Sequence, residues 1–115
     1  EGITFDLISD SNRNLSRILD ILDETNLRTD DQGNNIVDGD SVTYRATYLI
    51  DENGEVFHEG INQMPIGRNV NEYLRLIDAM THNQEHGEVC PANWEDGDEA
   101  MTADRDGVSS YLKTK

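Results

Sequence analysis

Apolar residues recur with two periodicities along this chain of 115 residues, and these periodicities predict where its strands and helices lie. Residues 2–8 alternate between apolar and polar side chains, which predicts a short strand. Residues 12–24 carry apolar side chains at spacings of three and four, which predicts an amphipathic helix behind a polar cap at residues 9–11. The polar residues 25–41 lack this periodicity and contain two glycines, so we expect a surface loop there.

The middle of the chain predicts a β-hairpin followed by a second helix. Residues 42–50 and 55–61 are rich in strand-forming side chains, and the Asn53-Gly54 pair between them tolerates the positive φ of a tight turn. Asn69 can then cap a helix with an apolar stripe formed by Val70, Tyr73, Leu74, Ile77 and Met80. Three charged residues fall outside this stripe: Glu72, Arg75 and Asp78.

The helical pattern is lost after His82, which predicts a change of organisation. We therefore divide the chain into residues 1–82, which belong to a packed domain, and residues 83–115, which form an extended arm and tail. Near the end, the spacing of Val108, Tyr111 and Leu112 predicts one short helix.

The charge of the chain restricts its partners. The formal net charge is −15, from 24 acidic and 9 basic residues, so we expect no binding to nucleic acid or to anionic membranes. Aspartate outnumbers glutamate and only two lysines are present, a composition that suits solubility in high salt. A halophile-like surface and an ordinary acidic surface both remain open. No apolar run reaches the roughly 20 residues of a membrane span and no leader is evident, so we expect a soluble, cytoplasmic protein.

The candidate chemistry lies in the segment Gly87–Trp94, which holds the single cysteine and the single tryptophan. Pro91 favours an extended conformation at Cys90, and the polar surroundings predict a sulfur that is not buried in a core. A lone cysteine has no disulfide partner in the same sequence, so a redox role requires a partner thiol on another molecule or in sequence beyond this chain. An inert buried cysteine is the alternative.

Two metal hypotheses are weaker. His82, His86 and Cys90 recur every four residues, which would align three zinc ligands along a helix, but Gly87 and Pro91 oppose a helix there. The aspartates of residues 30–40 do not follow the spacing of a calcium loop. We therefore expect no metal and no cofactor.

The segment Gly87–Trp94 with the following Glu95-Asp96-Gly97 resembles the resolving-cysteine segment of the typical two-cysteine peroxiredoxins. The members that it resembles most are the bacterial and archaeal ones similar to alkyl hydroperoxide reductase C and thioredoxin peroxidase. Three further runs occur in the order of that family: Phe5–Asp10, Tyr44–Asp51 and Gly67–Glu72.

The resemblance implies an α/β fold, the C-terminal half of a thioredoxin-like peroxiredoxin fold: strand, helix, β-hairpin, helix and an extended C-terminal arm. Residues 25–41 look like an insertion relative to the family. The motif of the peroxidatic cysteine is expected before Glu1. The resemblance also implies three site residues, namely Cys90 as the resolving cysteine, Arg45 as the active-site arginine and Arg68 as a supporting arginine.

The implied activity is that of an antioxidant oxidoreductase, a cofactor-free peroxidase of hydrogen peroxide and organic hydroperoxides with a redox-active disulfide. The family implies an obligate homodimer with an intersubunit disulfide through Cys90, a ring of five dimers, and a thioredoxin or a flavoprotein disulfide reductase as the reductant. The alternative is a non-catalytic truncated or split chain that acts as an assembly or redox-partner subunit.

The halophile-like interpretation makes a prediction for the complete protein. Because dissolved ions screen the mutual repulsion of acidic side chains, its melting temperature should rise between low and molar salt concentration. Thermal unfolding followed by circular dichroism measures this directly. A melting temperature that stays constant or falls identifies an ordinary acidic surface.

Overall fold

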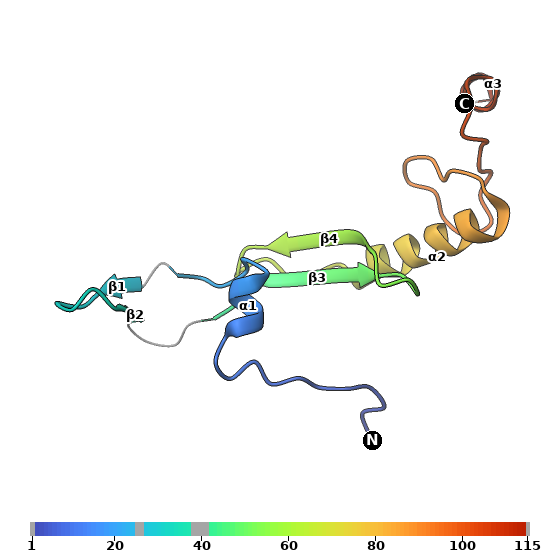
Figure 1. Cartoon of the computed structure of the whole chain (residues 1–115). Helices are drawn as coiled ribbons and strands as arrows, with labels where there is room; N and C mark the ends of the chain where they lie inside the picture. Colours follow the sequence, from blue (N-terminus) through green and yellow to red (C-terminus); the bar gives the residue numbers. More distant parts are fainter. Residues whose placement is uncertain (1, 25–26, 38–41, 115) are drawn as a thin grey trace. The chain divides into compact units, whose positions relative to one another are not determined.

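The structure is a computed structural model and describes residues 2–24, 27–37 and 42–114. Helices and strands both occur, as the α/β expectation requires, and Figure 1 labels them. Their order along the chain is α1 (Asn14–Ile18), β1 (Leu27–Thr29), β2 (Asn35–Val37), β3 (Arg45–Ile50), β4 (Val56–Asn62), α2 (Val70–His86) and α3 (Arg105–Lys113). None of the helices in these ranges is long and apolar enough to cross a membrane.

The chain divides into two compact units. The first comprises Glu1–Tyr48 and Glu59–Gly67, and the second comprises Leu49–His58 and Arg68–Lys115. The β-hairpin of β3 and β4 contributes residues to both, whereas α2 and everything after it belong to the second unit.

The predicted strand over residues 2–8 is wrong: this segment forms neither strand nor helix. Its apolar side chains are exposed, including Ile3, Phe5 and Leu7. A strand needs a partner for its backbone N–H and C=O groups. The two sheets of the described residues pair β1 with β2 and β3 with β4, so neither supplies that partner.

The helix predicted over residues 12–24 is much shorter, because α1 has five residues. It begins after Arg13, and its first turn is held by Asp10, whose carboxylate accepts hydrogen bonds from the backbone N–H groups of Leu15 and Ser16. The left-handed Asp20 (φ 54°) then turns the chain away. After this turn, the Ile21 carbonyl oxygen accepts a hydrogen bond from Tyr44 N at 2.8 Å. The chain there pairs with the segment before β3 instead of continuing the helix.

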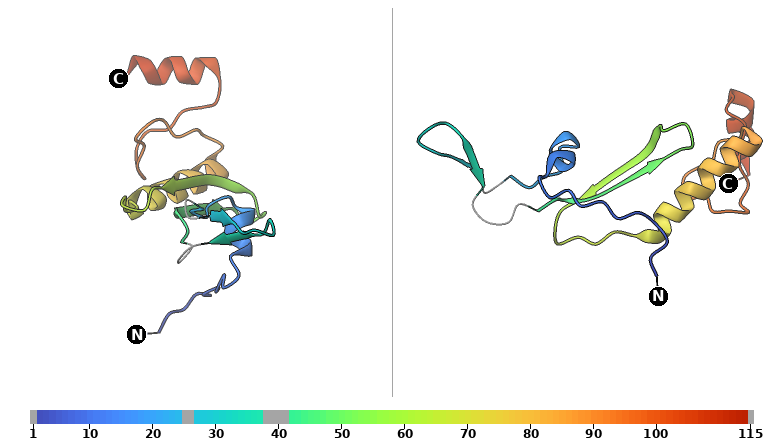
Figure 2. Two further views of the ribbon diagram at one scale, coloured as in Figure 1. Left: turned by 90° about the vertical axis from the view of Figure 1, so that its left-hand side faces the viewer. Right: turned by 60° about the horizontal axis from the view of Figure 1, so that its bottom comes forward.

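The loop predicted over residues 25–41 contains a short antiparallel ribbon, so that prediction is wrong for these strands. β1 and β2 pair with Leu27 opposite Val37 and Thr29 opposite Asn35, and Figure 2 shows them as a separate ribbon. The Asp30 carboxylate accepts hydrogen bonds from Gln32 N and Asn34 N and so closes the turn. Residues 25–26 and 38–41 of the predicted loop lie outside the described residues.

The predicted β-hairpin is confirmed as β3 and β4, which form a two-stranded sheet. Its turn follows the predicted chemistry. Gly54 adopts a φ of 83°, and the Asp51 carboxylate accepts hydrogen bonds from Asn53 N at 2.9 Å and Glu55 N at 2.8 Å.

The second predicted helix is confirmed as α2, and its cap is confirmed as well, since the Asn69 side chain accepts a hydrogen bond from Asn71 N at 3.1 Å. The expected loss of helical structure after His82 is wrong, because α2 continues to His86. No proline or glycine interrupts residues 83–86, and Gly87, in a left-handed conformation (φ 70°), ends the helix. The short helix predicted near the end is confirmed as α3, with the Asp104 side chain as its cap.

Candidate functional site

Cys90 lies in the non-helical segment that follows α2, as the sequence predicts. Val89 pairs with Met101 through two backbone hydrogen bonds of 2.8 and 3.1 Å, and a turn from Pro91 to Trp94 follows, closed by Trp94 N donating to Pro91 O at 3.1 Å. Cys90 therefore stands between a short β-bridge and a tight turn. These local contacts fix the backbone on both sides of the sulfur.

The Cys90 thiol is half-buried against α2, so it is neither fully exposed nor enclosed in a core. Its sulfur donates a weak hydrogen bond to the Ala79 carbonyl oxygen at 3.6 Å. Burial raises the pKa of the Cys90 thiol, the positive charge of Arg75 partly opposes this rise, and the negative charge of Glu88 adds to it. In this position the sulfur is therefore a protonated thiol at neutral pH and a poor nucleophile.

Trp94 anchors the segment that carries Cys90. Its side chain is only 2% exposed, and its indole N–H donates to the Asp98 carbonyl oxygen at 3.0 Å. The ring lies against His82 of α2, with 5.0 Å between the ring centroids. Among the described residues Trp94 is the largest side chain with so little exposure. Its burial beside His82 therefore fixes the Cys90 segment on α2.

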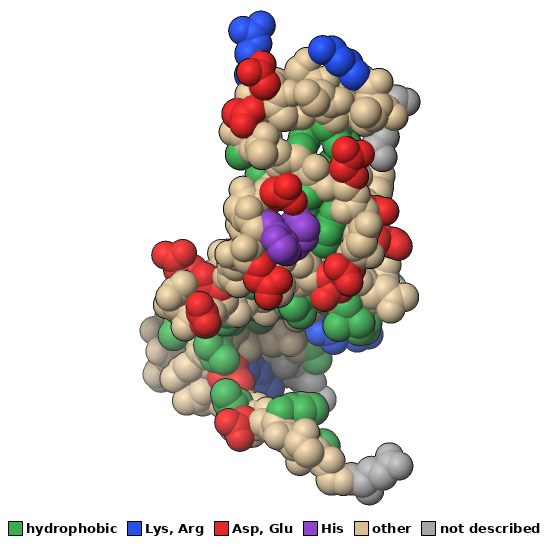
Figure 3. Space-filling model, turned by 90° about the vertical axis from the view of Figure 1, so that its right-hand side faces the viewer, with side chains coloured by type: hydrophobic (Ala, Val, Ile, Leu, Met, Phe, Trp, Pro, Cys, Tyr) green, Lys and Arg blue, Asp and Glu red, His purple; other side chains and the backbone are tan. Residues whose placement is uncertain are grey.

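A second group of contacts holds the residues that precede Cys90 in the sequence. His82 Nε2 and Glu88 Oε2 are 2.9 Å apart, and Asn83 Nδ2 donates to the Glu88 carbonyl oxygen at 2.7 Å. The His86 ring packs against His82 with 4.6 Å between centroids. Figure 3 shows histidine side chains gathered on one face with acidic side chains around them. The last turns of α2 thus hold residue 88 as well as residue 94.

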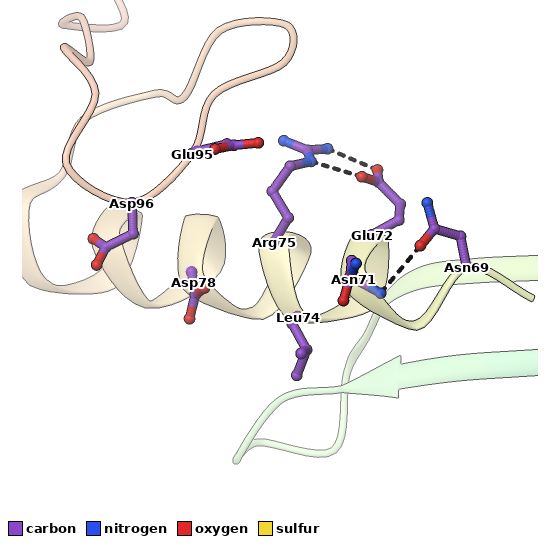
Figure 4. Close-up of a pocket in the computed structure, with 8 residues that line it drawn as sticks. All are labelled: Asn69, Asn71, Glu72, Leu74, Arg75, Asp78, Glu95 and Asp96. Atoms are coloured by element: carbon purple, nitrogen blue, oxygen red, sulfur yellow. Dashed lines mark hydrogen bonds and ion pairs between the residues drawn. The ribbon is translucent and has the colours of Figure 1, made fainter.

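Arg75 joins α2 to the Cys90 segment directly. Its Nε and Nη2 donate to the two carboxylate oxygens of Glu72 at 2.7 and 2.8 Å, and its Nη1 donates to the Trp94 carbonyl oxygen at 3.1 Å. Figure 4 shows the guanidinium held in this fork beside Glu95. The hydrogen bonds from Arg75 hold the pKa of the Glu72 carboxyl below its usual range.

Although Arg75 is outside the predicted apolar stripe, its side chain is half-buried, with 25% of it exposed. Sequence reasoning missed the contact of Arg75 with the Cys90 segment, and it gave Trp94 no anchoring role. The signal for the fork was present, because Glu72 and Arg75 are three residues apart on a helix. Nothing in the spacing of residues reveals the contact with Trp94, which depends on the return of the chain along α2.

A cavity of about 420 Å³ opens beside Arg75. Four of its lining residues are acidic: Glu72, Asp78, Glu95 and Asp96. Figure 4 shows them along α2 and on the segment that faces it. The surface next to the Cys90 segment is therefore strongly negative, which disfavours anionic ligands.

Arg45 belongs to the first unit and is the first residue of β3. Its Nε donates to the Met64 carbonyl oxygen at 2.7 Å, a contact that ties β3 to the loop after β4. The two terminal nitrogens have no hydrogen-bond acceptor within the described parts of the chain. This leaves donors that a small polar ligand can use.

Arg68 belongs to the second unit and lies in the exposed loop before α2, next to the capping residue Asn69. Cys90 and Arg68 thus share a unit, whereas Arg45 is in the other. The three predicted site residues are placed on the β3 strand, the α2 entry loop and the segment after α2.

The zinc hypothesis receives no support. His82 and His86 lie on α2, but the helix ends at Gly87 and Cys90 lies beyond it, as the sequence predicts. Over residues 2–24, 27–37 and 42–114, no group of three histidine, cysteine, aspartate or glutamate side chains is arranged to hold a metal ion.

Comparison with known proteins shows the family to which the chain belongs. The pattern of the C-terminal domain of 1-Cys peroxiredoxin matches residues 79–114, which include the Cys90 segment and α3. Alkyl hydroperoxide reductase C of Helicobacter pylori is 40% identical over 111 residues, which are 96% of this chain and 48% of that protein. Thioredoxin peroxidase of Fasciola hepatica is 38% identical over 112 residues, which are 97% of this chain and 50% of that protein.

The fold agrees. The crystal structure of the reduced 2-Cys peroxiredoxin of Plasmodium vivax superposes with a TM-score of 0.73 at 36% identity, and the match covers 92% of this chain and 47% of that one. The chain thus spans about half the length of the relatives that it matches. In sequence and in fold, it is the C-terminal portion of a peroxiredoxin.

Proposed function

We propose that this chain is part of a thiol peroxidase that reduces hydrogen peroxide and organic hydroperoxides, and that Cys90 is its resolving cysteine. The main support is the position of Cys90, a half-buried thiol on a non-helical segment that is attached to α2 by side-chain contacts. Such a segment can detach without unfolding a helix. The relatives named alkyl hydroperoxide reductase C and thioredoxin peroxidase suggest the reaction class.

In the proposed step, the peroxidatic cysteine of a second subunit has been oxidised to a sulfenic acid by peroxide. The Cys90 thiol loses its proton, and the thiolate attacks the sulfenic sulfur. The S–S bond forms while the S–O bond breaks, and the departing hydroxide takes up a proton to give water. A dithiol reductant then reduces the intersubunit disulfide, and a thioredoxin or a flavoprotein disulfide reductase fits this role.

Arg45 is proposed to bind the peroxide and to lower the pKa of the peroxidatic thiol. Met64 fixes the guanidinium through Nε, and the terminal nitrogens remain as donors for the departing oxygen. Arg68 is proposed as a supporting arginine at the start of α2. The proposed assembly is a homodimer, arranged as a ring of five dimers in the cytoplasm, with residues 83–115 as the arm that reaches the partner.

The role of Cys90 is tested by Cys90→Ser in the complete protein. Wild-type protein treated with peroxide should give a covalent dimer on a non-reducing gel, whereas the variant should give none because the attacking sulfur is missing. The first oxidation by peroxide, followed as sulfenic acid formation, should persist in the variant and serves as the control. A dimer band of wild-type intensity in Cys90→Ser contradicts the assignment.

The role of Arg45 is tested by Arg45→Lys in the complete protein. Lysine keeps the charge but loses the planar fork of donors, so turnover should fall at least about tenfold, equivalent to ~1.4 kcal/mol of transition-state stabilisation. Steady-state peroxide consumption measures this fall. Arg105→Lys, a change on α3, is the matched control and should leave turnover unchanged. A rate equal to that of the wild type removes Arg45 from the active site.

A further inference from the structure

Arg75 makes hydrogen bonds to both elements of one interface, to Glu72 on α2 and to Trp94 in the Cys90 segment. Glu72, one turn earlier on α2, accepts two parallel hydrogen bonds from Nε and Nη2. A guanidinium held at two points has a fixed plane, so the direction of its remaining nitrogen is fixed too. Figure 4 shows the Arg75 guanidinium with its two hydrogen bonds to Glu72.

The remaining nitrogen, Nη1, bonds the Trp94 carbonyl oxygen. Trp94 is joined to Cys90 by the turn that Trp94 N closes on Pro91 O, and Asn93 adopts a left-handed conformation within it (φ 62°). Because this turn is tight, a restraint on the Trp94 backbone also restrains Cys90. Within the described residues, the hydrogen bond of the sulfur is the weak one to the Ala79 carbonyl oxygen at 3.6 Å.

We propose that Arg75 is a positioning residue that holds the Cys90 segment on α2, and that its hydrogen bond to the Trp94 carbonyl must break before Cys90 can travel to a partner thiol. This inference rests on the proposed resolving role of Cys90. Arg75 then controls how often the segment detaches, while Glu72 keeps the guanidinium aimed at Trp94.

The opposite role is also testable. The Arg75 charge favours the thiolate form of Cys90, so Arg75 would speed the chemistry of the sulfur if this were its main effect. A holding role predicts that loss of Arg75 makes Cys90 more reactive. An activating role predicts that loss of Arg75 makes Cys90 less reactive at neutral pH.

The experiment is iodoacetamide alkylation of Cys90 in the complete, reduced protein, read by mass spectrometry of the peptide that contains it. Arg75→Met keeps most of the side-chain length and removes all donors, so alkylation should be about fivefold faster at neutral and at alkaline pH. Arg75→Lys restores one donor and the charge, and its rate should lie between those of Arg75→Met and the wild type. Arg105→Met on α3 is the matched control and should react as the wild type does.

Equal rates for Arg75→Met and the wild type, or slower alkylation of Arg75→Met at neutral pH, overturn the proposal. Equal rates for Arg75→Met and Arg75→Lys also overturn it, because packing alone would then explain the effect. If Arg75→Met fails to fold, Glu72→Gln decides the question, since it leaves Arg75 in place but loosens its fork and should accelerate alkylation in the same direction. The readout needs no peroxide, so it remains valid even if Cys90→Ser shows that Cys90 is not the resolving cysteine.

Discussion

The attachment of the Cys90 segment to α2 is the interaction on which the rest of the site depends. Two contacts of different kinds provide it. Trp94 buries nearly its whole side chain, which contributes at most about 4 to 6 kcal/mol of apolar burial. The charged hydrogen bond from Arg75 to the Trp94 carbonyl is half-exposed and is worth on the order of 1 kcal/mol. Burial of Trp94 therefore supplies most of the free energy of attachment, and the hydrogen bond adds a smaller part, on which the proposed holding role of Arg75 rests.

This attachment also determines the state of the sulfur. The half-buried Cys90 thiol has a raised pKa, because desolvation outweighs the attraction of Arg75. A protonated thiol resists oxidation and adventitious disulfide exchange. Under the proposed resolving role, detachment of the segment removes the desolvation and so favours the thiolate when the partner sulfur comes within reach. The same contacts that order the segment thus keep the thiol protonated in this structure.

Local signals in the sequence were sufficient for the hairpin, α2 and α3, because turn residues, caps and apolar spacing act within a few residues. Asn53-Gly54, Asn69 and Gly87 each perform the role that their chemistry favours. The same reasoning failed for residues 2–24. Alternation at residues 2–8 identifies a possible strand but supplies no partner, and the periodic apolar residues 15–22 meet the left-handed Asp20 and pair with the segment at residues 42–44 instead.

Part of the candidate site could likewise be predicted from local sequence, and part could not. The Cys90 segment was found because cysteine, proline and tryptophan carry distinctive chemistry, and the comparisons confirm the resemblance of the chain to peroxiredoxins. Arg75 was missed because its partner Trp94 lies 19 residues away in the chain, and no periodic pattern connects them. A charged residue outside an apolar stripe is exposed only where no other segment folds over it, and here the returning chain covers it.

The most direct test of this account is the pH dependence of Cys90 alkylation in the reduced wild-type protein, compared with the same protein in denaturant. The account predicts slower alkylation in the native state at neutral pH and a midpoint at higher pH than in the denatured state. Equal rates and equal midpoints in the two states would show that α2 does not hold the sulfur, and would contradict the account.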